Sequence, residues 1–108
     1  MKLCWHGEAR AEADAAAAFY DDKQPGLAQR FLDDLEQTLH RIQRHPQAYR
    51  QVEGEIRKCR VAHFPYGVIY RVRSDVIEIV AVMHLRRLPG YWKQSRWVRL
   101  KGLAHRSK

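Results

Sequence analysis

The sequence predicts an α+β fold of two layers, a helix hairpin packed on a small, mainly antiparallel sheet. Apolar residues recur at helical spacing in the first half of the chain and alternate with polar residues in the second half. With 108 residues the chain is long enough for one core, and neither layer can bury its apolar side alone. We expect the order β-α-α-β-β-β in a domain of residues 1–92, followed by a basic C-terminal extension of residues 93–108.

The first half predicts a short strand and two helices. Residues 3–5 form the strand, and residues 8–22 form a helix whose apolar face is narrow and rich in alanine. Pro25 suits the first turn of a second helix, which ends before Pro46 because the residue preceding a proline avoids the helical region. Its apolar stripe runs from Leu27 to Ile42 and is widened by Ala28 and Leu32. The tight connection at residues 22–25 predicts an antiparallel hairpin.

Three strands follow, at residues 57–61, 68–73 and 77–84, joined by short turns. Strict alternation in the last strand places Ile77, Ile79, Ala81 and Met83 toward the helices and leaves Val80 and Val82 on the opposite face. We expect this second apolar face to be covered by Leu88, Tyr91 or Trp92 of the C-terminal segment, or by a partner protein.

Charge is distributed unevenly along the chain. The net charge is +8, yet residues 1–83 contain twelve Lys and Arg against all twelve Asp and Glu. Residues 84–108 contain eight Lys and Arg and no acid, interleaved with Trp92 and Trp97. The pattern favours a surface that faces a polyanion, although a solvated tail has the same composition.

Several function classes are excluded or disfavoured. The longest apolar stretch, from Val76 to Met83, is too short to span a bilayer, and no signal peptide is visible. We therefore expect a cytoplasmic protein that makes no contact with membranes. Cys4 and Cys59 read as buried thiols, because neither has a partner at a zinc-binding spacing. We expect no metal and no cofactor.

Two segments carry a resemblance to a known family. Residues 57–72 contain Phe64-Pro65-Tyr66, and residues 79–87 contain His84-Leu85-Arg86, followed by Leu88-Pro89-Gly90-Tyr91-Trp92. From about residue 6 to residue 92 the chain resembles the RelE/ParE toxin superfamily, and it lies nearer the ParE-like plasmid stabilisation proteins. The resemblance implies the toxin of a bacterial type II toxin–antitoxin module, bound in a hetero-oligomer by a small, acidic, helical antitoxin.

Members of this superfamily act in two ways. ParE-like toxins block DNA gyrase, and RelE-like toxins cut messenger RNA on the ribosome. We expect the gyrase activity, with a target-binding surface on the basic end of the chain. Its residues are Arg86, Arg87, Trp92, Lys93, Arg96, Trp97 and Arg99.

Metal-free RNA cleavage is the alternative. It needs a base, a cation beside the phosphate and an acid. The resemblance offers Lys58, Arg60, Arg86, Tyr91 and His84 for these roles. Ala62 or His63 occupies the position at which the nucleases have a further arginine. This difference favours inhibition of DNA gyrase over RNA cleavage. A third alternative is a non-toxic, basic module that binds nucleic acid.

Overall fold

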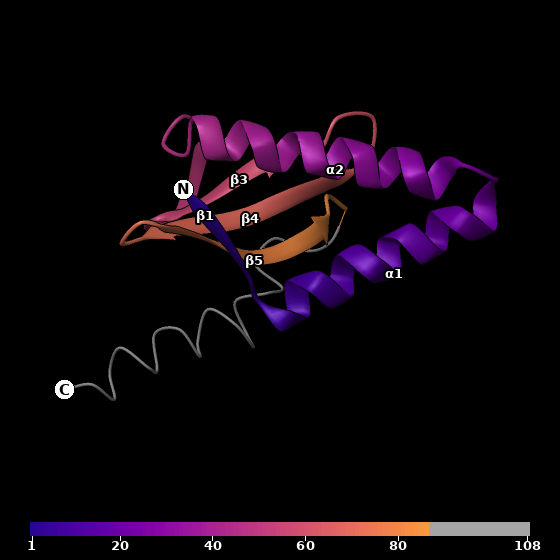
Figure 1. Cartoon of the computed structure of the whole chain (residues 1–108), viewed down its shortest axis with the longest axis horizontal. Helices are drawn as coiled ribbons and strands as arrows, with labels where there is room; N and C mark the ends of the chain where they lie inside the picture. Colours follow the sequence, from indigo (N-terminus) through magenta and orange to yellow (C-terminus); the bar gives the residue numbers. More distant parts are fainter. Residues whose placement is uncertain (87–108) are drawn as a thin grey trace.

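The computed structural model describes residues 1–86, which form two helices packed on one side of a five-stranded sheet (Figure 1). The expected two-layer α+β architecture is confirmed. The structure adds one strand, so the order is β-α-α-β-β-β-β. In chain order the elements are β1 (Lys2–Trp5), α1 (Gly7–Lys23), α2 (Leu27–Arg44), β2 (Arg50–Glu53), β3 (Ile56–Arg60), β4 (Tyr66–Arg73) and β5 (Val76–His84).

The strands lie in the order β1-β5-β4-β3-β2. Four of them form the antiparallel meander β2-β3-β4-β5, and β1 is added parallel to the first half of β5. The additional strand β2 is an edge strand whose first three residues are exposed. It has no alternating apolar pattern, which explains why the sequence did not predict it.

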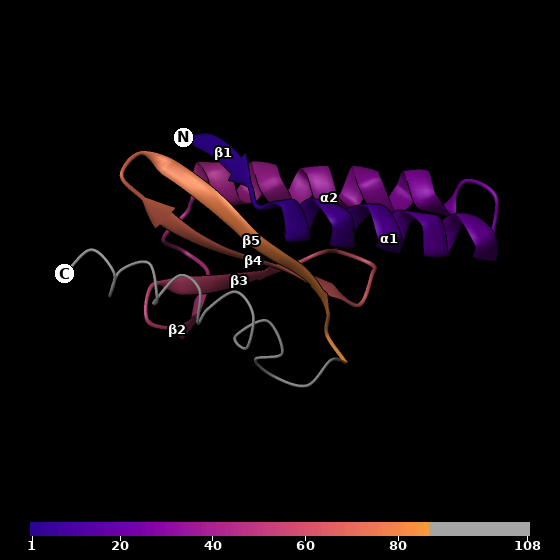
Figure 2. The same cartoon turned by 90° about the horizontal axis from the view of Figure 1, so that it is seen from below.

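The two helices run antiparallel along the same side of the sheet (Figure 2). Ala9, Ala13 and Ala16 are buried on α1, as expected from its narrow apolar face. The prediction for the start of α2 was wrong by two residues. Pro25 lies in the turn before the helix, and the cap is Gly26, whose φ of +84° a residue without a side chain adopts readily. Leu32 is exposed and does not widen the apolar stripe.

An aromatic cluster joins the helices to the β3–β4 turn. The ring of Tyr20 lies 5.4 Å from that of Phe31 and 4.9 Å from that of Phe64, centroid to centroid. Tyr66 packs edge-on against Phe31 at 5.4 Å. Such tilted and edge-to-face pairs are favourable for aromatic rings, so the Phe64-Pro65-Tyr66 motif is where the turn contacts both helices.

A bulge in β5 reverses the side of the sheet to which part of the strand's side chains point, compared with the prediction. Ile69 pairs with Ala81 while Tyr70 pairs with Ile79, so Val80 is an extra residue in the ladder. Beyond the bulge the alternation is reversed. Val82 joins the core beneath the helices, which is the opposite of the prediction.

Ala81 and Met83, predicted to face the helices, belong instead to a second apolar cluster with Ile56, Ile69 and Val80. This cluster contains no helical residue, and we call its side of the sheet the far side. The placement of Val80 there is confirmed. The expected covering residues Leu88, Tyr91 and Trp92 lie outside the described residues.

Two further expectations have clear outcomes. Both cysteines are free thiols, and Cys59 is buried, but Cys4 is exposed on the edge strand β1. Within residues 1–86, neither helix is long and apolar enough to cross a membrane.

Tyr70 is fully buried in β4, and its hydroxyl donates a hydrogen bond of 2.7 Å to the carbonyl oxygen of Pro46. Burial is the main cause that raises the pKa of Tyr70 to about 12. A phenol that ionises later in the folded state than in the unfolded chain stabilises the fold fully below the unfolded value, and this contribution is lost as the pH rises through the folded value.

We therefore predict that the free energy of unfolding falls between about pH 10, the ordinary tyrosine pKa, and pH 12. Tyr70→Phe should cost about 1 kcal/mol at pH 7, because the Pro46 carbonyl loses its donor. The same variant should lose less stability than the wild type in the alkaline range, as measured by urea unfolding. Parallel pH curves for the two proteins would contradict this role.

Candidate functional site

Two of the predicted site residues lie together on the far side of the sheet. Lys58 and Arg60 alternate with the buried, helix-facing Cys59 on β3. Gly67, opposite Arg60 on β4, makes room for the lysine, because a Cβ placed there would lie 3.3 Å from Cγ and Cδ of Lys58. The aliphatic stem of Lys58 thus lies across Gly67 toward Leu85, close to the end of β5.

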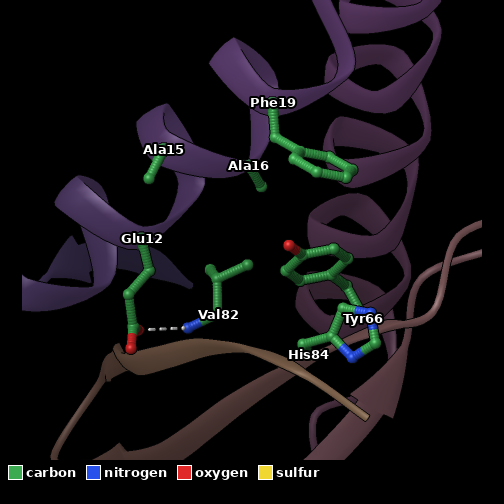
Figure 3. A pocket seen from close by; sticks show the side chains of 7 residues that line it. All are labelled: Glu12, Ala15, Ala16, Phe19, Tyr66, Val82 and His84. Atoms are coloured by element: carbon green, nitrogen blue, oxygen red, sulfur yellow. Dashed lines mark hydrogen bonds between the residues drawn. The ribbon is translucent and has the colours of Figure 1, made fainter. Parts of the chain in front are cut away.

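His84 lies on the other side of the sheet. Its ring packs edge-on against Tyr66 with 5.1 Å between centroids, beneath α1 (Figure 3). Its Nδ1 accepts a hydrogen bond of 3.0 Å from the backbone N–H of Arg86. The structure therefore does not bring His84 together with Lys58 and Arg60.

Arg86 is the last described residue and is exposed. Within residues 1–86, Arg86 forms no ion pair with Asp33 or Glu36, two acids that are exposed on α2. The other predicted target-binding or catalytic residues, Arg87, Tyr91, Trp92, Lys93, Arg96, Trp97 and Arg99, lie outside the described part of the chain.

His63 lies in the β3–β4 turn and contacts α2. It adopts φ +67° in the β3–β4 turn, and its Nδ1 lies 3.1 Å from Oδ2 of Asp34 on α2. Arg41, two turns after Asp34 on α2, donates a hydrogen bond of 3.1 Å to the carbonyl oxygen of Arg60. These contacts fasten the turn to α2, so we assign His63 no chemical role.

A partly buried charge network lies on the far side near β1. Nε2 of His6 and Nη2 of Arg71 lie 2.9 and 3.2 Å from Oε1 of Glu78. Burial opposes ionisation of Glu78, but the hydrogen bonds from His6 and Arg71 outweigh it and lower the pKa of this carboxyl group. Arg71 is almost fully buried, and its Nε has no hydrogen-bond partner. Glu78 therefore supplies the counter-charge that makes burial of Arg71 tolerable.

A groove on the helix side was not predicted from the sequence. It is lined by Glu12, Ala15, Ala16 and Phe19 of α1 and by Tyr66, Val82 and His84 of the sheet, and it has a volume of about 180 Å³ (Figure 3). Phe19 is half exposed at its end. The small alanine side chains create the hollow, and the alanine-rich face of α1 was the signal that could have indicated it.

The described residues contain no group of three His, Cys, Asp or Glu that could hold a metal ion. The described residues form two surfaces on opposite sides of the sheet. The surface on the far side is cationic, and the one on the helix side is an apolar groove. His84, the histidine that could act as a base, is not next to the cations.

Comparison with known proteins identifies a family and a solved structure of similar fold. The model of the family described as the ParE toxin of the type II toxin–antitoxin system parDE matches residues 3–89. A solved structure of the chromosomal ParDE toxin–antitoxin system from P. aeruginosa is similar in fold, with a TM-score of 0.71 and 22% identity over 80% of this chain and 97% of that one. Among curated proteins, none matches.

The contribution of Glu78 to stability can be tested by removing its charge. Glu78→Gln removes the counter-charge of Arg71 and should lower the free energy of unfolding by about 2 kcal/mol at pH 7, less than for a fully buried pair because Glu78 is partly exposed. A carboxyl group with a lowered pKa stabilises the fold above its ordinary pKa, and this contribution is lost as the pH falls through the lowered value. The difference between variant and wild type should therefore shrink below about pH 4.

Denaturant unfolding at pH 7 and below about pH 4 measures the free-energy difference between the variant and the wild type. Glu36→Gln makes the same chemical change on an exposed position of α2 and should leave stability nearly unchanged. Equal stability of the Glu78 and Glu36 variants at pH 7 would show that the network does not support the fold.

Proposed function

This chain belongs to the family of ParE toxins of type II toxin–antitoxin systems, and we propose that it arrests bacterial growth by binding and inhibiting DNA gyrase. The family match over residues 3–89 is the observation that carries the proposal. Membership also implies a cognate antitoxin as partner.

The placement of the candidate catalytic residues supports inhibition by binding. RNA cleavage requires a base and a cation within reach of one phosphodiester. Lys58 lies on the far side of the sheet, whereas His84 packs against Tyr66 on the helix side. Binding requires no such assembly, only an accessible surface of suitable shape and charge.

The charge distribution supports a target that carries negative charge. Residues 84–108 contain eight Lys and Arg and no acid, and Arg86, the described member of this set, is exposed. Cations concentrated at one end of a chain attract a polyanionic target such as gyrase with its DNA, and this attraction weakens as salt rises.

One observation keeps messenger cleavage as a second candidate. Lys58 and Arg60 share the far side, and Gly67 lets the lysine stem lie flat on the sheet. A nuclease would use these cations with Tyr91, which lies outside the described residues. Induced cells would then contain cut messengers, which the gyrase proposal does not predict.

We predict that the purified toxin at micromolar concentration inhibits supercoiling of relaxed plasmid by gyrase. Arg86→Ala should require about tenfold more toxin for half-inhibition, the effect of losing ~1.4 kcal/mol of binding free energy. Arg50→Ala removes another exposed arginine, from the edge strand β2, and should leave inhibition unchanged.

Unimpaired supercoiling at micromolar wild-type toxin would refute the gyrase proposal. Equal inhibition by the Arg86 and Arg50 variants would keep gyrase as the target but exclude Arg86 from the contact.

A further inference from the structure

The folded part of the chain is divided into an acidic and a basic region. Residues 1–36 contain four Lys and Arg against eight Asp and Glu, whereas residues 37–60 contain six Lys and Arg against two acids. The helix hairpin is therefore acidic along α1 and the first half of α2, and the basic region covers the second half of α2 and the β2–β3 hairpin. This region is separate in sequence from the cations of residues 84–108.

Three arginines of the basic region come together where α2 meets β3. β2 pairs with residues 56–58 of β3. Beyond this pairing, Nη2 of Arg41 donates a hydrogen bond of 3.1 Å to the backbone carbonyl oxygen of Arg60. Arg44 lies one turn after Arg41 on the same face of α2. We call Arg41, Arg44 and Arg60 the α2–β3 surface.

Within residues 1–86, no acidic side chain neutralises the α2–β3 surface. The ion pairs of this part of the chain use Asp34 and Glu78, and neither acid is paired with one of the three arginines. The negative end of the helix dipole favours basic residues near the end of α2, but it does not account for Arg60 on a strand. Like charges that lie side by side repel one another, so binding of an anion stabilises the cluster.

The side chains around the cluster indicate which polyanion fits. Arginine binds phosphate oxygens with two parallel hydrogen bonds. Proteins that hold single-stranded nucleic acid add exposed aromatic rings, on which unpaired bases stack. Within residues 1–86, Phe19 is the only exposed Phe, Tyr or Trp, and it lies on α1 beside Lys23. The α2–β3 surface thus matches a double helix, which displays phosphates and keeps its bases stacked.

The acidic region determines from which side a polyanion approaches. α1 lies along β5 and α2 lies along β3 (Figure 1). Asp14, Asp21 and Asp22 are exposed on α1 and repel phosphates on the β5 side of the helix layer. Arg44 and Arg60 are exposed on the β3 side. The two regions together direct a polyanion to the α2–β3 surface.

We propose that the α2–β3 surface binds the phosphate backbone of double-stranded DNA. Arg44 and Arg60 contact phosphates, and Arg41 holds the helix and the strand together beside them. Such contacts position a protein on the duplex and do not read its sequence. This inference goes beyond the proposed function, because it assigns a DNA contact to the chain itself, and it does not depend on whether gyrase is the target.

Binding of the full chain to a fluorescent duplex of about 20 base pairs, followed by anisotropy between about 50 and 200 mM salt, tests the proposal. Arg44→Gln and Arg60→Gln should each lower the slope of log Kd against log salt by about one. Each should also raise the Kd at the lowest salt about tenfold. Neither side chain makes a hydrogen bond within residues 1–86, so thermal unfolding should show that both variants fold like the wild type.

Arg30→Gln is the matched control, because Arg30 is exposed on the acidic half of the same helix. It should keep the slope and the affinity of the wild type. The cations of residues 84–108 are the same in all of these proteins, so their contribution to DNA binding cancels in the comparison. Equal slopes for the Arg44, Arg60 and Arg30 variants would overturn the proposal.

A single-stranded oligonucleotide of the same length tests the kind of nucleic acid. The wild type should bind the duplex more tightly, since a single strand releases fewer counterions for each phosphate contact. Equal or tighter binding of single-stranded DNA or RNA would overturn the assignment to double-stranded DNA. The assay contains no gyrase, so its failure leaves the gyrase proposal standing. Failure of the toxin to inhibit supercoiling would likewise leave the DNA measurement unchanged.

Discussion

The bulge at Val80 is the constraint on which the rest of the molecule depends. β5 contacts β1 and β4 within the sheet and α1 in the helix layer. Without the extra residue, strict alternation would turn Val82 away from the helices. With it, Val82 completes the core beneath α1, Ala81 and Met83 join the far-side cluster, and the N–H of Val82 meets Glu12. The inserted residue thus determines which side chains lie on each apolar face and which backbone N–H points to the edge of the sheet.

The sheet then separates two surfaces with different properties. On the helix side, the groove between α1 and the end of β5 is apolar and bordered by a hydrogen-bonding edge. On the far side, Lys58 and Arg60 lie beside an apolar cluster whose members all come from strands. A toxin must recognise both a target and an antitoxin, and two separate surfaces allow each contact to be made by its own chemistry.

Much of this fold followed from periodicity in the sequence, and the exceptions have physical reasons. The helices and three strands were predictable because half-buried elements repeat with their own period. β2 was not, since Val52 is its lone apolar residue and is exposed. The bulge was hidden because Ile79 to Met83 are all apolar, so a change of facing leaves no polar marker. Glu12 could be read as a residue that favours the start of a helix, but its contact with Val82 depends on tertiary structure.

We propose that this chain acts by binding gyrase, without chemistry of its own. The most direct test is to induce the chain without its antitoxin and to read plasmid topology and messenger integrity from the same cells. Gyrase inhibition predicts relaxed plasmids and intact messengers at the onset of growth arrest. Cleaved messengers in cells whose plasmids remain fully supercoiled would contradict it.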